Sequence, residues 1–181
     1  TKRQWHIEFP RPIQITTPML QIDYEYGANG ELLRETQTDL FVASSPIRET
    51  TYSYNEAGLL ASINGPRTDI DDITTFTYDE NLELVTITDG QGNSTSITSR
   101  TTAGYPASIV EAKGTTTLLE YDLRNRLVKQ TVEGDVTSFT YDDIGQLTAI
   151  TYPSGVKTHY AYTGSRLLSR IYDDQGNVIL Y

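Results

Sequence analysis

The chain of 181 residues contains no cysteine, two histidines, one tryptophan and one methionine. Without cysteine there can be no disulfide, no Cys/His zinc set and no cysteine nucleophile, and we expect no bound metal or other cofactor. Basic residues are also scarce: 14 Lys and Arg stand against 24 Asp and Glu, for a net charge of −10. Nucleic acids and anionic membrane surfaces bind clustered positive charge, so neither is expected as a partner.

Long apolar runs are absent too, because no stretch approaches the roughly 20 residues that a membrane-spanning helix needs. No signal peptide is recognisable and the chain starts at Thr1, so we expect a processed chain or a fragment of a longer protein. The length is nevertheless enough for one domain with a sizeable core. Thirteen Tyr favour strands, and thirteen Gly with seven Pro, scattered along the chain, favour many turns.

One short pattern recurs along most of the chain, most clearly from Phe139 to Ile150. It has an aromatic residue, a Tyr two positions later, a Gly-containing turn, a Leu six positions after the Tyr, and an Ile three further on. The aligned tyrosines are Tyr26, Tyr54, Tyr78, Tyr121, Tyr141 and Tyr162, and the leucines are Leu32, Leu60, Leu84, Leu127, Leu147 and Leu168. The Ile position holds Ile in four copies, but Glu35 and Gln130 in the other two. Such a regular array predicts a repeat structure.

Two further copies are less complete. Arg100 takes the Tyr position of a degenerate unit whose Leu position is Pro106, and the unit spacings are then 28, 24, 22, 21, 20 and 21. Near the N-terminus, Pro12 and Ile15 match Pro106 and Ile109, which predicts a second strand preceded by a first strand that includes Trp5 to Phe9.

Each unit is typical of a β-hairpin. Side chains alternate between the two faces of a strand, so Tyr160 and Tyr162 share a face. Turn residues follow each Tyr and each Ile, among them Asn29-Gly30, a favoured two-residue turn pair. Eight full or partial units predict about 14 to 16 strands. Leu and Ile three apart lie on opposite strand faces, so the sheet is either partly apolar on both sides or carries a bulge between them.

The predicted fold is therefore all-β, with tandem antiparallel hairpins that form one long, twisted and curved sheet. We expect one repeat array over residues 1–181, with inserted loops at 36–50 and 64–74 where the period breaks. Leu118 to Val128 is the best candidate for a helix, but the repeat register makes it strand, turn and strand. The two ends of such a strip have open edges, which favours edge-to-edge self-association.

The motif Tyr-Asp-x-x-Gly-x-Leu-x-x-Ile, present as Tyr141 to Ile150, resembles the YD repeat of Rhs proteins. Tyr121 to Leu127 and Tyr78 to Leu84 match it with the turn Gly replaced, and the resemblance covers roughly Ile22 to the end. It is shared with bacterial polymorphic toxins, C components of insecticidal toxin complexes, wall-associated proteins and teneurins.

The resemblance implies a β-sheet strip that winds into a shell-like spiral and, in the toxins, encloses a C-terminal effector. It implies a secreted or cell-surface location, with a bacterial secretion system as the route. The expected partners are neighbouring repeats of the same protein and an enclosed effector. Toxin-type cores end in an autoproteolytic Asp-Pro motif, and no Asp-Pro pair occurs here. We therefore expect an internal segment of a repeat array.

The tyrosine rows allow two interpretations. A Tyr at the same place in every unit favours cross-strand ladders that stabilise the sheet. Alternatively, exposed rows stack on sugar rings, and the candidate binding residues are then Tyr24, Tyr26, Tyr52, Tyr54, Tyr160 and Tyr162. The leading hypothesis is a non-catalytic structural segment, and the alternative is a module that binds carbohydrate or a partner surface.

Motifs for catalysis or metal binding are weak or absent in the sequence. Asp89 to Asn93 and Asp173 to Asn177 faintly resemble calcium loops, as does the cluster of Asp69, Asp71 and Asp72, but Asp and Asn beside Gly are ordinary turn residues. Asn93-Ser-Thr95 forms a glycosylation sequon. His6 and His159 stand alone, and no Gly-x-Ser-x-Gly elbow, P-loop or His-Glu-x-x-His motif occurs. We expect no enzyme activity.

Overall fold

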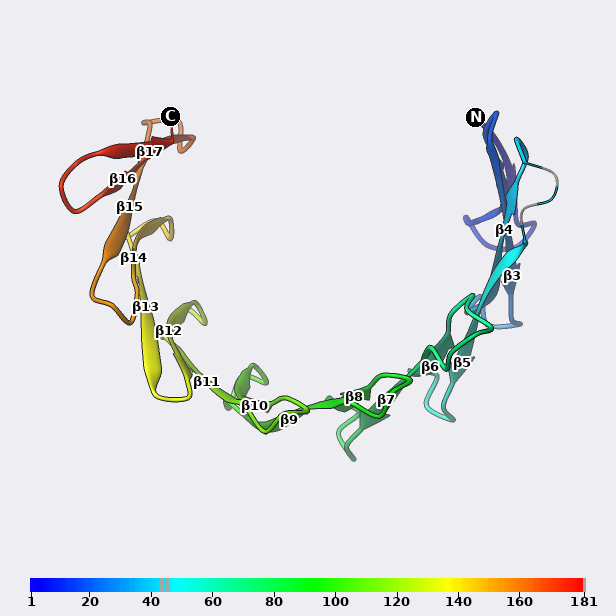
Figure 1. Cartoon of the computed structure of the whole chain (residues 1–181), viewed down its shortest axis with the longest axis horizontal. Coiled ribbons are helices and arrows are strands. Elements are labelled where there is room, and N and C mark those ends of the chain that lie inside the picture. The colour runs from blue at the N-terminus through cyan, green and yellow to red at the C-terminus, as the bar shows by residue number, and fades with distance from the viewer. Residues whose placement is uncertain (43, 45, 181) are drawn as a thin grey trace. The chain divides into compact units, whose positions relative to one another are not determined.

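A computed structural model describes residues 1–42, 44 and 46–180 of the chain. It falls into two compact units, Thr1–Thr95 and Ser96–Tyr181, which we describe separately. Both units consist of antiparallel strands joined by turns (Figure 1). Neither unit has a helix among the described residues, so none there is long and apolar enough to cross a membrane.

In the first unit each strand pairs with the next strand along the chain. Its strands are β1 (Lys2–Trp5), β2 (Pro12–Thr16), β3 (Leu20–Tyr26), β4 (Leu32–Asp39), β5 (Arg48–Tyr54), β6 (Leu60–Asn64), β7 (Ile73–Tyr78) and β8 (Leu84–Thr88). The next strand, β9 (Ser94–Arg100), begins at the end of this unit and continues into the second.

The second unit repeats the same arrangement, and β9 pairs with β10 through residues 96–100. Its further strands are β10 (Pro106–Val110), β11 (Thr116–Tyr121), β12 (Leu127–Val132), β13 (Asp135–Tyr141), β14 (Leu147–Thr151), β15 (Lys157–Tyr162), β16 (Leu168–Asp173) and β17 (Val178–Leu180). The predicted all-β fold of tandem antiparallel hairpins is confirmed, with 17 strands in the described residues against the 14 to 16 expected. The segment from Leu118 to Val128 is strand, turn and strand, as the repeat register required.

A β-bulge lies in every hairpin that carries the Tyr motif. In the hairpin of β13 and β14, Phe139 pairs with Ile150 and Tyr141 with Leu147, which leaves Thr148 as the extra residue. The same register shift occurs in five other hairpins. The extra residue places Leu and Ile on the same face as the aromatic pair. Of the two alternatives for the spacing of Leu and Ile, the bulge is therefore the one that the structure adopts.

The bulge gives the sheet two different faces. The tyrosine face, defined by the aligned Tyr, the aromatic residue two positions before it, Leu and Ile, is largely apolar. The opposite polar face carries cross-strand polar pairs. Ser53 and Ser62 lie 2.7 Å apart through their hydroxyl oxygens, and the Lys129 ammonium lies 2.7 Å from a Glu120 carboxylate oxygen. Such pairs add a little stability each and keep this face soluble.

The strands that the structure describes enclose no buried core. Among the described residues no hydrophobic or polar residue is buried, so the expectation of a sizeable core is wrong. The reason is the single layer: a core needs two layers packed face to face, and each unit has one. The chain length set only an upper limit on burial, and the repeat pattern uses that length for strands side by side.

The turn after each aligned Tyr is held by its first residue. In the turn after Tyr141, the Asp142 N–H donates to the Gln146 carbonyl (2.9 Å) and the Gly145 N–H to the Asp142 carbonyl (3.1 Å). The Asp142 Oδ1 accepts the backbone N–H groups of Ile144 (3.1 Å) and Gln146 (2.8 Å). Gly145 has φ of 94°, the left-handed region that glycine adopts without strain.

Three turns of this kind hold another residue in the left-handed position. Leu82 has φ of 64°, Asn125 of 59° and Arg166 of 65°. Each donates its N–H to the carbonyl three residues earlier, as Gly145 does. The repeat therefore keeps its turn geometry where glycine is replaced, at a cost in backbone strain that is smallest for Asn.

The two-residue turn expected at Asn29-Gly30 is wrong. The Gly30 N–H donates to the Gly27 carbonyl (3.0 Å) and the Gly27 N–H to the Glu31 carbonyl (2.8 Å), which makes the longer turn of the other units. A two-residue turn is found at Glu133 and Gly134 instead, where both φ values are positive, 50° and 94°. The repeat register outweighs the local preference of the Asn-Gly pair.

Three segments differ in extent from the expected ones. Thr36 pairs with Glu49, so β4 and β5 extend into the predicted 36–50 loop. The segment that connects these two strands is therefore 40–47. Two of its residues, Ala43 and Ser45, lie outside the described residues. Likewise, the 64–74 loop narrows to 65–72. The predicted strand from Trp5 to Phe9 is wrong, because β1 ends at Trp5 and the next residues form a loop closed by hydrogen bonds to His6.

Candidate functional site

The six aligned tyrosines all use their hydroxyl groups in the same way. Each hydroxyl donates a hydrogen bond to the backbone carbonyl at the Leu or Pro position of the preceding unit, at 2.8 to 2.9 Å. The pairs are Tyr26 with Pro12, Tyr54 with Leu32, Tyr78 with Leu60, Tyr121 with Pro106, Tyr141 with Leu127, and Tyr162 with Leu147. The acceptor lies at the irregular end of its hairpin, where ladder pairing is disrupted. The Tyr of one repeat thus supplies a hydrogen-bond donor to a backbone carbonyl of the repeat before it.

A second contact covers some of these rings. The residue just before the Leu or Pro position lies against the Tyr of the next unit in three cases. The Arg126 guanidinium carbon is 4.6 Å from the centre of the Tyr141 ring, and Arg11 is 5.8 Å from Tyr26. Tyr105 stands in the equivalent place against Tyr121, with ring centres 5.5 Å apart. Sequence analysis missed this contact, although an Arg or aromatic residue at a fixed place was a signal for it.

The six candidate binding tyrosines lie in two places. Four of them are on the tyrosine face of β3 and β5, and two are on β15 of the other unit; they are Tyr24, Tyr26, Tyr52, Tyr54, Tyr160 and Tyr162. All are half-buried. Desolvation against the sheet raises the pKa of Tyr24, Tyr52 and Tyr160 above the usual phenol value. These side chains therefore lie on the sheet surface, and three of the six have their hydroxyl engaged within it.

Glu35 is a carboxylate on the tyrosine face between β3 and β5, and it interacts with several of these rings. It occupies the Ile position of its unit and pairs across the ladder with Tyr24. Desolvation is the main cause that raises the pKa of Tyr24 and of Tyr52, and the negative charge of Glu35 raises both further. Glu35 also accepts a hydrogen bond from the Gln37 side-chain amide at 2.7 Å. The arrangement puts hydrogen-bond acceptors among aromatic rings.

The two calcium-like segments are turns closed by Asp. The Asp89 Oδ1 accepts the N–H groups of Gln91 and Asn93, both at 2.9 Å, and its Oδ2 accepts the Asn93 side-chain amide at 2.9 Å. Asp173 makes the same contacts with Gln175 and Asn177. The amide donors, chiefly the Asn side chain in each turn, hold the pKa of both Asp residues below the usual value. The carboxylate oxygens of these two turns are thus hydrogen-bond acceptors for the turn itself.

The acidic loop of residues 65–72 is also tied to itself. Asp69 is paired with Arg67, whose Nη2 is 2.8 Å from Oδ2. Asp71 accepts the Ile73 N–H at 3.1 Å, and the Oδ2 of Asp72 accepts the Arg67 N–H at 3.0 Å. Its Oδ1 has no hydrogen-bond partner among the described residues. Within those residues no group of three or more His, Cys, Asp or Glu is close enough to hold a metal ion.

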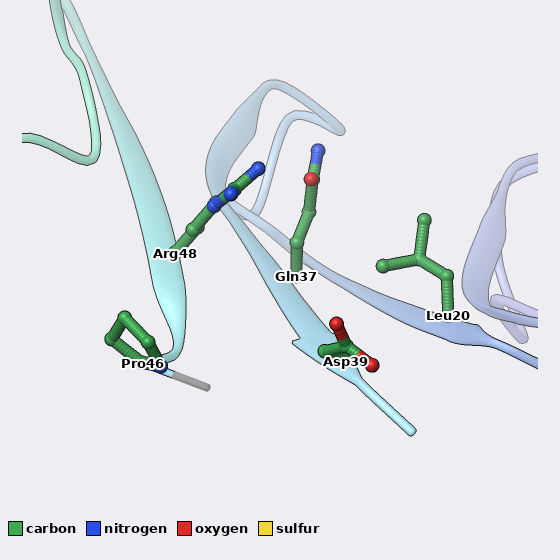
Figure 2. A pocket seen from close by; sticks show the side chains of 5 residues that line it. All are labelled: Leu20, Gln37, Asp39, Pro46 and Arg48. Atoms are coloured by element: carbon green, nitrogen blue, oxygen red, sulfur yellow. The ribbon is translucent and has the colours of Figure 1, made fainter. Parts of the chain in front are cut away.

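A small cavity of about 110 Å³ lies at the ends of β3, β4 and β5. Its lining side chains are Leu20, Gln37, Asp39, Pro46 and Arg48 (Figure 2). Sites for drug-sized molecules usually measure about 300–1,000 Å³. The cavity is therefore too small for a ligand of that size. It lies where sequence analysis placed the first inserted loop.

Comparisons with known proteins agree with this geometry. The family model of the RHS Repeat matches residues 121–157 and 141–178, whereas no curated protein matches the chain. The crystal structure of TcdB2-TccC3-Cdc42 is similar at a TM-score of 0.64 and 17% identity, over 94% of this chain and 10% of that one. The crystal structure of TcdB2-TccC3 without its hypervariable C-terminal region gives a TM-score of 0.67 at 16% identity, with 94% and 10% covered.

A third similar structure is the Tc holotoxin pore of Photorhabdus luminescens, with a TM-score of 0.53, 16% identity, and 91% of this chain and 11% of that chain covered. The chain thus spans about a tenth of the length of these proteins, and identities this low show a shared fold alone. The matched repeats cover residues 121–178, and the Tyr-Asp hairpins of the remaining chain repeat their geometry, so the chain is similar to Rhs (YD) repeat proteins.

Proposed function

We propose that the chain is a non-catalytic wall segment of a larger, secreted or cell-surface Rhs/YD-repeat protein, whose β-shell encloses or presents an effector domain. A bacterial secretion system is the proposed route. The observation that carries the proposal is the use of all six aligned Tyr hydroxyls to fasten each unit to the one before it. Side chains occupied in this way stabilise a wall, whereas an active site needs groups that are free to meet a substrate.

The two faces of the sheet support the same function. A wall separates two environments, and this one-layered sheet has an apolar tyrosine face and a polar face with charged pairs. The absence of a buried core in the described residues fits a segment that relies on neighbouring repeats for stability. The similar toxin structures contribute the fold only, so the enclosed effector is part of the proposal.

Labelling of single cysteines tests the shell, since the chain has no cysteine of its own. Ile87 and Thr77 lie next to each other in the hairpin of β7 and β8 but on opposite faces, because Ile87 pairs with Phe76 and Thr77 with Thr86. Both are exposed. In the intact parent protein, a bulky polyethylene-glycol maleimide should label Ile87→Cys and Thr77→Cys at very different rates.

The small reagent N-ethylmaleimide is the control, because it should reach both cysteines in the parent protein. The isolated 181-residue chain should be labelled at both sites by the bulky reagent. Equal rates for the two sites with the bulky reagent in the parent protein would contradict a closed shell.

A second candidate function is glycan binding, and Glu35 is the observation that favours it. Carbohydrate sites combine aromatic rings that stack on sugars with carboxylates that accept sugar hydroxyl groups. On β3, β4 and β5 the acceptor is Glu35, and the rings are those of Tyr24, Tyr26 and Tyr52. In the repeat that contains Tyr160 and Tyr162, the equivalent position holds Ile171. We therefore assign the candidate site to β3, β4 and β5.

Glu35→Ile separates this function from the structural one. Four other units carry Ile at this position, so the variant should fold at least as stably as the natural chain. If a glycan array shows a ligand, Glu35→Ile should lose it, while Gln130→Ile, at the same position of another unit, should keep it. An array without any bound glycan would refute this second function and leave the wall function standing.

A further inference from the structure

His6 occupies the Tyr position of the first unit, six residues before Pro12, and it closes the loop that joins β1 to β2. We propose that residues 6–11 form a pH-sensitive latch, the His6 latch, which is closed while the His6 imidazole is neutral and opens when the imidazole is protonated. The latch controls how firmly β1 is held to β2. This inference concerns a conformational device that is independent of the proposed wall function.

The closed latch depends on a lone pair of His6. Its Nδ1 accepts the backbone N–H of Glu8 at 3.0 Å and that of Phe9 at 3.3 Å. Only a nitrogen without a proton can accept, so the closed loop requires the neutral ring with its proton on Nε2. Protonation places an N–H at Nδ1, directed at two other N–H donors. Both hydrogen bonds are then lost and replaced by repulsion between like dipoles.

Other contacts of the loop depend on the same geometry. The Phe9 ring stacks on the His6 ring, with centres 4.8 Å apart, and lies so close to Gly30 that a Cβ there would meet it at 3.1 Å. Arg11 donates from Nη1 to the Gly30 carbonyl and lies over the Tyr26 ring. The loop thus covers the first Tyr and its turn. Release of Phe9 uncovers the turn at Gly30.

The charged surroundings do not compensate for a proton on His6. The Tyr26 ring of β3 lies 6.0 Å from the His6 ring between centres, and the charged residues of the loop itself are Glu8 and Arg11. Glu31 is turned toward its own turn, where it accepts the Asn29 N–H. Arg11 is itself cationic. Among the described residues no carboxylate forms an ion pair with His6 that would favour the charged ring.

His159 provides an internal contrast. Its Nε2 lies 2.8 Å from Asp174 Oδ1, and its ring stacks on Tyr172 with centres 5.1 Å apart. A proton on His159 strengthens this pair, because it turns a neutral hydrogen bond into a charge-assisted one. The two histidines of the chain therefore respond to acid with opposite sign. Imidazole side chains ordinarily change charge between about pH 5 and 8, and this sets the pH range of the test.

Backbone amide exchange followed by NMR on the full chain tests the latch. Protection of the Glu8 and Phe9 amides, corrected for the intrinsic effect of pH on exchange, is compared at pH 7.5 and pH 5.0. We expect the protection factors of both amides to be at least roughly 10-fold lower at pH 5.0 than at pH 7.5. A loss of this size is expected when two hydrogen bonds of ordinary strength are broken. Protection that does not change with pH would overturn the proposal.

The decisive variant is His6→Asn. An Asn side-chain oxygen can accept the same N–H groups, but it does not titrate, so protection of Glu8 and Phe9 should be equal at both pH values. His6→Phe keeps an aromatic ring without an acceptor and should be unprotected at both. His159→Gln is the matched control and should leave the pH response of Glu8 and Phe9 intact. A wild-type pH response in His6→Asn, or its loss in His159→Gln, would refute the latch.

Discussion

Removal of one hydroxyl group from the repeated Tyr tests the central feature of the fold. Tyr141→Phe deletes only the oxygen that donates to the Leu127 carbonyl at 2.8 Å. The ring stays, and with it the contact to Arg126 at 4.6 Å. The change therefore isolates the hydrogen bond between two adjacent units from the packing of the aromatic ring.

The expected cost follows from the environment of the bond. An ordinary hydrogen bond contributes about 0.5–1.5 kcal/mol net, and an acceptor left without a partner costs more when it is buried. Tyr141 is half-buried, so we expect about 1 kcal/mol. In a chain of this length such a loss lowers the Tm by about 2–4 °C. With an m-value of about 1–3 kcal/mol/M, the urea midpoint falls by roughly 0.3–1 M.

The assay is urea unfolding followed by circular dichroism, with Tyr152→Phe as the matched control. Tyr152 is 39% exposed and lies in a turn, and its hydroxyl donates no hydrogen bond to the described residues. Its replacement should change stability by less than about 0.5 kcal/mol. Equal losses in the two variants would refute the reasoning, because the loss would then come from any Tyr hydroxyl and not from the bond to the preceding unit.

Three further predictions concern the turns. Leu82→Gly should stabilise the chain by about 0.5–1 kcal/mol, because Leu82 has φ of 64° and its side chain is 55% exposed. Gly145→Ala should destabilise the chain by about 1 kcal/mol, because Gly145 also has a positive φ. Urea midpoints that shift in the same direction in both variants would contradict this. The Asp122 carboxylate accepts the Arg126 backbone N–H and is paired with the Arg126 side chain, and these contacts hold its pKa below the usual value. A lowered folded-state pKa gives stability that is present above the unfolded value and lost as the pH falls through the folded value. The Tm should therefore fall below about pH 4, and less steeply in Asp122→Asn, as measured by thermal scans from pH 2 to 6; an unchanged slope would refute this role. Finally, Asn125→Gly should gain less than Leu82→Gly in the same urea assay, because Asn tolerates a positive φ better than Leu does.

The sequence predicted the fold well because the repeat imposes one geometry on every unit. Tyr141, Gly145 and Leu147 have fixed spacing, and that spacing fixed strand, turn and strand without any knowledge of tertiary contacts. The same register was right over Leu118 to Val128, where a helical period competed with it. It failed at Trp5 to Phe9, because hydrogen bonds from the loop to His6 are specific to that place and do not recur.

The candidate functional residues were harder to judge from sequence. A stripe of Tyr is equally compatible with a ladder and with a binding row, since both need an aromatic residue in each unit. The structure distinguished Tyr26, Tyr54 and Tyr162, whose hydroxyls are used inside the sheet, from Tyr24, Tyr52 and Tyr160. The position of Glu35 among these rings became visible only from the pairing of β3, β4 and β5.

The sequence by itself determined the period, the all-β class and the places of the turns, because these depend on side-chain alternation and on residues such as Gly and Asp that act locally. Tertiary structure decided three things that local rules leave open. It placed Leu and Ile on one face through a bulge, it joined each aligned Tyr to a carbonyl of the preceding unit, and it left the described residues without a buried core. Each of these depends on which strands lie side by side and on how many layers they form, and that is set by the whole array.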